Sequence, residues 1–167
     1  KRRAFLKTTV ASLLLGRAAT AAAPRNRRPN ILLIVSEDNG PHLSCYGDPY
    51  VQTPHLDSLA KQGVRFDRAY VPFAICSPSR ASLLTGLYPH QNGQIGLATH
   101  QFAMYGEFPN MASVLKQNGY RTGIIGKLHI NPASAFPFDL NWNPKEHISF
   151  ANRNMKEIAR IAGEFMS

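Results

Sequence analysis

Hydrophobic residues along the chain gather in short runs separated by polar and glycine-rich segments. Residues 31–35 (ILLIV) form a continuous apolar run, which is typical of a strand covered on both faces. Residues 64–71 and residues 120–125 have the composition of two further strands. The pattern therefore predicts three strands.

Helix signals lie between and after these runs. Residues 53–54 (TP) provide a capping residue and a proline at the first helical position, and Gly63 ends the predicted helix. A second helix is expected over residues 109–118, ending at Gly119, and a final helix over residues 152–166. Strands that alternate with helices predict an α/β fold with a mostly parallel sheet.

The net charge of +9 is concentrated at the start of the chain. Eight of the 19 basic residues precede residue 30, and no acidic residue does. From residue 30 onward, 11 basic residues stand beside 10 acidic ones. Because the remainder has almost no excess of positive charge, the sequence shows no basic binding face, and we expect no nucleic-acid partner.

Residues 1–29 have the character of an export signal and a short linker, and they are set aside in predicting the fold. A basic start is followed by an apolar run, which is broken at Arg17, and by small residues suited to signal cleavage. The opening KRRAFLK resembles a twin-arginine export signal, although a general secretory signal also fits. The apolar run is too short for a stable membrane span. We therefore expect export machinery as a partner and the bacterial periplasm as the location.

Reactive side chains follow each predicted strand. Glu37 and Asp38 follow the first strand, Cys76 follows the second after a short loop, and Lys127 and His129 follow the third. Ligands of parallel sheets bind beyond the carboxyl ends of the strands, so these residues are predicted to share one rim. Each group taken alone is equally consistent with a turn, a solvated cation or a loop histidine.

Cys76 precedes another predicted helix, in which Ser77 is the cap and Pro78 the first residue. The cysteine would then lie at a helix amino terminus, where free N–H groups and the helix dipole favour negative charge. Arg80, one turn later, adds a permanent cation. These features favour a reactive thiol, while a buried structural cysteine and a disulfide with Cys45 stay open as alternatives.

The residues around this cysteine resemble a known signature. CSPSR (residues 76–80), followed by LTG (residues 84–86), is similar to the signature of the type I sulfatases. RPNILLI (residues 28–34), followed by an acidic pair, resembles the opening strand of that family, and TPHLD (residues 53–57) resembles its next landmark. The resemblance implies an alkaline-phosphatase-like fold, in which helices sandwich a mostly parallel sheet.

Three further segments resemble one branch of the family. HQNGQIGL (residues 90–97), RTGIIGKLH (residues 121–129) and FPFD (residues 136–139) look most like the heparan N-sulfatases, or sulfamidases. This resemblance implies a glycosaminoglycan-type substrate, with the N-sulfate group of glucosamine as the expected target.

The resemblance also implies a metal site. Glu37 and Asp38 match the two acids that hold a divalent cation, usually Ca²⁺, and Cys76 in its modified form matches a residue that also touches the metal. Carboxylate ligands suit such a hard cation. The sequence departs from the family at Glu37, where aspartate is usual.

The resemblance implies that Cys76 is a precursor. In the family this cysteine is oxidised to formylglycine, whose hydrate attacks sulfur with one hydroxyl and expels sulfate with the aid of the other. Arg80 matches the residue that steadies the nucleophile, Lys127 the cation on the sulfate oxygens, and His129 the imidazole that bonds the formylglycine hydroxyl. A formylglycine-generating or sulfatase-maturating enzyme is therefore an expected partner, together with a sulfated carbohydrate substrate.

The family has further metal-binding residues and a carboxy-terminal subdomain beyond the segments matched here. Residues 30–167 are therefore expected to be the amino-terminal part of a truncated catalytic domain, inactive alone. An O-sulfatase, either aryl- or carbohydrate-directed, and a phosphonate monoester hydrolase are alternative functions. A binding protein in which Cys76 is never modified is a third.

Overall fold

The computed structural model describes residues 28–143 and 154–167. The chain divides into two compact units, residues 1–38 and residues 39–167, and each is considered by itself. The expected export signal lies almost wholly outside the described residues, so it stays a prediction. No helix in the described ranges is long and apolar enough to cross a membrane.

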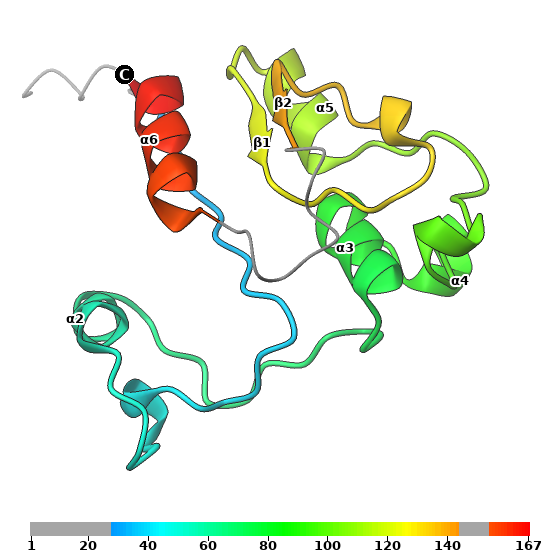
Figure 1. The fold of residues 1–167 in the computed structure, drawn as a ribbon. Coiled ribbons are helices and arrows are strands. Elements are labelled where there is room, and N and C mark those ends of the chain that lie inside the picture. The colour runs from blue at the N-terminus through cyan, green and yellow to red at the C-terminus, as the bar shows by residue number, and fades with distance from the viewer. Residues whose placement is uncertain (1–27, 144–153) are drawn as a thin grey trace, which may run out of the picture. The chain divides into compact units, whose positions relative to one another are not determined.

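Among its described residues, the second unit contains seven α- and 3₁₀-helical segments before the end of its second strand, and one helix after it (Figure 1). The helices and 3₁₀ segments are η1 (Ser44–Tyr46), α2 (Pro54–Gln62), α3 (Cys76–Thr85), α4 (Pro89–Asn92), η2 (Ala98–His100), α5 (Met111–Gln117), η3 (Ala133–Ala135) and α6 (Met155–Met166). The strands are β1 (Gly123–Ile125) and β2 (Leu140–Trp142).

Local signals placed several of these helices correctly. Helix α2 begins at the predicted proline, and the Gly63 N–H closes it by donating to the carbonyl of Leu59 at 3.0 Å. Helix α5 begins after Asn110, whose side chain accepts from the backbone N–H of Ser113 at 3.1 Å. The chain leaves α5 through Gly119, which has a left-handed φ of 76°. The predicted final helix is confirmed over α6.

The two strands are parallel, which agrees with the predicted class of sheet, although β2 was not among the predicted strands. Gly123 is opposite Leu140 and Ile125 is opposite Trp142 in the register. The connection between them contains η3, and the carboxylate of Asp139 accepts from the backbone N–H of Thr122 at 2.8 Å just before the pairing begins. The α/β prediction is therefore confirmed, with a short sheet.

Two predicted strands are wrong for this structure. Residues 31–35 and residues 64–71 form no strand, and their apolar side chains are exposed, with Ile34 at 78% and Val64 at 80%. A strand needs hydrogen-bonded neighbours, and in the described ranges the sheet consists of β1 and β2 alone. An apolar run can predict a strand, but it supplies no pairing partner.

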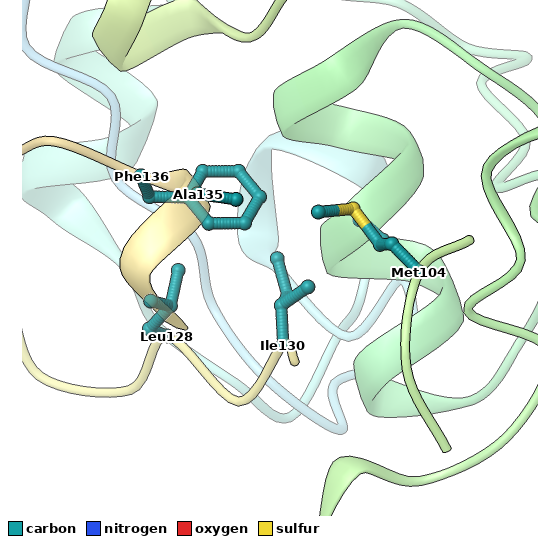
Figure 2. Close-up of a cluster of buried hydrophobic side chains, with 6 residues drawn as sticks. Met104, Leu128, Ile130, Ala135 and Phe136 are labelled. Carbon is teal, nitrogen blue, oxygen red and sulfur yellow. The ribbon is translucent and has the colours of Figure 1, made fainter. Parts of the chain in front are cut away.

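The core of the second unit lies between α3 and the segment that follows β1. Its buried members are Ala81, Met104, Leu128, Ile130, Ala135 and Phe136. Figure 2 shows Leu128, Ile130 and Phe136 grouped together, with Met104 opposite them. Ala81 of α3 is completely buried in this cluster, so the cluster fixes α3 against residues 126–136.

Candidate functional site

Helix α3 begins at the cysteine itself. Ile75 is extended, with φ −133° and ψ 142°, and its carbonyl accepts the first helical hydrogen bond from the Ser79 N–H at 2.9 Å. Cys76 is therefore the first helical residue, half-buried and free of any disulfide, as is Cys45. The N–H groups of this first turn have no partner within the helix and favour a negative charge beside Cys76.

The predicted cap of α3 was wrong. Ser77 was expected to cap the helix and Pro78 to open it, but the helix starts earlier and both residues lie inside its first turn. The Ser77 hydroxyl accepts instead from the backbone N–H of Ala98, at 2.9 Å. Pro78 is tolerated because the first turn of a helix needs no N–H donor.

Arg80 joins α3 to the segment after β1. It stands four residues after Cys76, so the two side chains occupy the same face of the helix. One guanidinium nitrogen of Arg80 donates a hydrogen bond to the backbone carbonyl of Lys127. Two of the sequence motifs, 47 residues apart in the chain, are thereby held together.

The segment after β1 alternates between core and half-exposed side chains. Leu128 and Ile130 are buried at 6% and 2% exposure, while Lys127 and His129, which precede each of them, are half-buried. The backbone turns at Gly126, which has a φ of 103°. His129 has a φ of 55°, a left-handed conformation that costs an L-residue about 1–2 kcal/mol. Such a conformation is retained only where surrounding contacts impose it.

Four of the predicted site residues thus belong to two neighbouring parts of the second unit, α3 and the segment after β1. Cys76 and Arg80 belong to the first part, and Lys127 and His129 to the second. Glu37 and Asp38 belong to the other compact unit. Asp38, like His129, is a non-glycine residue with a left-handed backbone, at a φ of 56°.

The sequence interpretation missed the buried polar side chains of residues 90–97. Asn92 and Gln94 are both completely buried. The Asn92 side-chain amide donates to the carbonyl of Leu87 at 3.2 Å, beyond the end of α3. The signal that could have revealed this role is two amide side chains set among glycines, because glycines permit close backbone approach. An added Cβ at Gly96 would lie 2.4 Å from the ring of Phe102.

The acid of the FPFD segment has a structural partner. Asp139 forms an ion pair with Lys116 at 2.6 Å, and it accepts from the Thr122 backbone N–H. These contacts, with the Lys116 ammonium as the larger cause, lower the pKa of Asp139 from 3.8 to about 2. This segment joins the carboxyl end of α5 to the start of both strands.

The TPHLD segment builds a separate polar cluster. The Ser44 hydroxyl donates to the carboxylate of Asp57 at 2.7 Å, and the Thr53 hydroxyl donates to the same carboxylate at 3.2 Å. A surface depression of about 420 Å³ adjoins this cluster, lined by Ser44, Cys45, Asp57, Ala60, Lys61 and Arg65. None of the predicted site residues lines this depression. Because Ser44 belongs to η1 and Asp57 to α2, the hydrogen bonds of this cluster hold η1 against α2.

A family model described as Sulfatase matches residues 29–157. The chain is 38% identical over 158 residues to human N-sulphoglucosamine sulphohydrolase, which covers 93% of this chain and 31% of that protein. It is 44% identical over 108 residues to N-acetylgalactosamine-6-O-sulfatase of Bacteroides thetaiotaomicron, covering 63% of this chain and 21% of the relative. The chain therefore spans less than a third of the length of these relatives.

The fold is also similar to a solved structure. The crystal structure of Ps i-CgsB superposes with a TM-score of 0.59 at 32% sequence identity, covering 81% of this chain and 33% of that one. This likeness confirms the expected alkaline-phosphatase-like α/β class for the part of the fold present here.

Proposed function

The chain belongs to the sulfatase family, and on that premise we propose that the full-length protein hydrolyses a sulfated carbohydrate with Cys76, oxidised to formylglycine, as its nucleophile. The observation that carries this proposal is the position of Cys76 as the first residue of α3, one turn from Arg80, which bonds the carbonyl of Lys127. A nucleophile and the cations around a sulfate group would be supplied by two elements that the core holds together.

The residue at position 76 fits this modification. It is small and half-buried, and it stands where free backbone N–H groups favour developing negative charge. When formed, the hydrated aldehyde supplies two hydroxyl groups, one to attack sulfur and one to release sulfate.

The remaining proposed residues of the two elements bind the sulfate group and orient the nucleophile. Arg80 steadies the nucleophile's oxygens from the same helix face, and its bond to the Lys127 carbonyl restricts the guanidinium. Lys127 supplies positive charge to the sulfate oxygens. His129 bonds a hydroxyl of the modified Cys76 and moves its proton. A formylglycine-generating or sulfatase-maturating enzyme would carry out the modification.

Glu37 and Asp38 are proposed as ligands of a divalent cation, with Ca²⁺ preferred. Their carboxylate oxygens are the ligands that a hard cation takes, and the modified Cys76 would offer a further oxygen. The cation would neutralise charge on the bound sulfate group. Two acids are too few for a complete Ca²⁺ shell, so further ligands from the rest of the full-length protein are part of this proposal.

The proposed substrate is N-sulfated glucosamine at the end of a glycan. The human relative, whose name specifies N-sulphoglucosamine, matches 93% of this chain, and this breadth supports the proposal. The second candidate is a 6-O-sulfated sugar, favoured by the higher identity of the Bacteroides relative over a shorter part of the chain. Loss of an amine requires a proton at nitrogen, so an N-sulfatase needs a positioned acid.

The domain organisation follows the same reasoning. Residues 30–167 are proposed as the amino-terminal part of a longer catalytic domain, which agrees with the fraction of each relative that the chain spans. Residues 1–29 are proposed as an export signal of the twin-arginine type, leading to the bacterial periplasm.

The test uses the full-length protein, produced together with a maturation enzyme. Sulfate release is measured from glucosamine N-sulfate and from glucosamine 6-O-sulfate at equal concentration. We expect faster release from the N-sulfate and, in Cys76→Ala, a loss of turnover of about a thousandfold or more with an unchanged circular dichroism spectrum. Release that is tenfold faster from the 6-O-sulfate would select the second candidate. Turnover that survives in Cys76→Ala would refute the proposed nucleophile.

A further inference from the structure

Residues 94–104, here termed the bridging loop, connect the nucleophile's helix to the segment of His129. On one side, the Ala98 N–H donates to the hydroxyl of Ser77, the neighbour of Cys76, at 2.9 Å. On the other side, the Asn131 side-chain amide donates to the carbonyls of Ala98 at 2.9 Å and Phe102 at 3.0 Å. The backbone of Ala98 therefore forms hydrogen bonds to both elements, through its N–H to Ser77 and through its carbonyl to Asn131.

Gln94 fixes the shape of this loop from inside. Its side chain is completely buried, and its amide nitrogen donates to the carbonyls of Gly96 at 2.8 Å and Phe102 at 2.9 Å. Its amide oxygen accepts from the backbone N–H of Asn131 at 3.1 Å. Both donor hydrogens and one acceptor site are thus used, so the loop and Asn131 form one satisfied network.

Asn131 is anchored through its backbone as well as its side chain. Besides the bonds above, its carbonyl accepts from the Met104 N–H at 2.8 Å. Two residues earlier, His129 holds a left-handed backbone with a φ of 55°. Between them, Ile130 is buried in the core at 2% exposure. The strained backbone of His129 is therefore imposed by a core contact and by the anchor at Asn131.

We propose that Asn131 is a positioning residue, which holds His129 in register with Cys76 through the bridging loop. This inference rests on the proposed function, since it assigns a purpose to the separation of two proposed catalytic residues. Asn131 acts through its amide bonds to the loop, and the loop acts through Ser77. The chain of contacts runs from Ser77 through Ala98 to Asn131, and every contact in it is a hydrogen bond of ordinary length.

The test variant is Asn131→Asp in the full-length, matured protein. The substitution preserves size and the two backbone hydrogen bonds, but it turns a donor that faces two carbonyl oxygens into a carboxylate. Repulsion between the new carboxylate and the carbonyl oxygens of Ala98 and Phe102 should move the bridging loop away from residue 131. We expect kcat to fall by about tenfold or more and KM to change less than about threefold, because misplacing a catalytic group affects the chemical step. The deficit should shrink at low pH, where a protonated carboxyl can donate again.

Asn110→Asp is the matched control. Asn110 is buried at 3% exposure, whereas Asn131 is half-buried, and the Asn110 amide likewise donates to two carbonyls, those of Phe108 at 3.0 Å and Ala135 at 2.8 Å. The substitution removes the same kind of bonds from the same unit, but Asn110 has no bond to the bridging loop. We expect a similar loss of thermal stability with kcat within about twofold of the wild type.

A second measurement is independent of turnover. Hydrogen–deuterium exchange of a peptide covering residues 127–130 should quicken in Asn131→Asp and stay unchanged in Asn110→Asp. Formylglycine content, measured by mass spectrometry of the peptide that contains position 76, normalises each kcat. Equal losses of kcat in the two variants, or unchanged exchange in Asn131→Asp, would overturn the inference. A wild type that releases no sulfate but shows the exchange difference would refute the proposed function and leave the positioning role standing.

Discussion

Two serines of α3 allow the energy of the hydrogen bond between Ser77 and Ala98 to be measured with one pair of substitutions. Ser77 and Ser82 are both buried, at 0% and 8% exposure, and both lie in the same helix. The Ser77 hydroxyl accepts from the Ala98 N–H at 2.9 Å. The Ser82 hydroxyl finds no hydrogen-bond partner in the part of the chain that the structure describes. Replacement by alanine therefore removes a bond in one case and an unpaired polar group in the other.

The expected energies have opposite signs. Ser77→Ala deprives the Ala98 N–H of its acceptor, which should lower the free energy of unfolding by about 1–2 kcal/mol. Ser82→Ala removes a desolvated hydroxyl and improves helix propensity, which should raise that free energy by roughly 0.5 kcal/mol. The two variants should therefore differ by about 2 kcal/mol, although they make the same chemical change.

The assay is urea unfolding of the full-length protein, followed by circular dichroism. Each variant lacks one oxygen atom in α3, so the dependence on urea should be unchanged and the midpoints can be compared directly. With a slope of about 2 kcal/mol per molar urea, the midpoints should differ by roughly 1 M. If Ser82→Ala is as destabilising as Ser77→Ala, the bond between Ser77 and the bridging loop does not support α3, and the reasoning above fails.

Three further predictions concern a charge, a backbone and the metal. Lys116 and a backbone N–H lower the pKa of Asp139 from 3.8 to about 2. The stability that this carboxylate contributes is therefore complete above pH 3.8 and is lost as the pH falls toward 2. In Asp139→Asn, the urea midpoint should depend less on pH across that interval. Gly93→Ala should lower the free energy of unfolding by about 1 kcal/mol or more, because φ is 92° and an added Cβ would lie 2.6 Å from the backbone nitrogen of Tyr105. In the control Gly106→Ala, the added Cβ meets open space, so the thermal midpoint should be unchanged. Asp38→Asn should weaken Ca²⁺ binding and activity together, and unchanged affinity in a calorimetric titration would contradict the assignment of Asp38 as a ligand.

Elements encoded by neighbouring residues could be predicted from the sequence. Helix α2 follows from a proline at its first position and a glycine at its end, and α5 follows from the capping side chain of Asn110. Both signals act over a few residues, so no distant contact is needed to interpret them. A parallel sheet was predicted and β1 lies within a predicted strand, but its partner β2 was not among the predicted strands.

Elements that depend on distant partners could not be predicted in the same way. Residues 31–35 have the composition of a buried strand but form none here, since strand formation requires a neighbouring strand and composition does not supply one. The start of α3 was displaced because the Ser77 hydroxyl bonds Ala98, 21 residues away, in place of its own helix. Cap rules hold only where no tertiary contact competes for the side chain.

The candidate site also contains some features that depend on local sequence and others that depend on distant contacts. A short sequence motif was enough to identify Cys76 and Arg80, because their chemistry depends on a spacing of one helical turn. The bond from Arg80 to the carbonyl of Lys127, and the loop that joins Ser77 to Asn131 through Ala98, depend on tertiary folding. These bonds join residues up to 47 positions apart in the chain, and hydrogen bonds form only where folding has already brought donor and acceptor to about 3 Å.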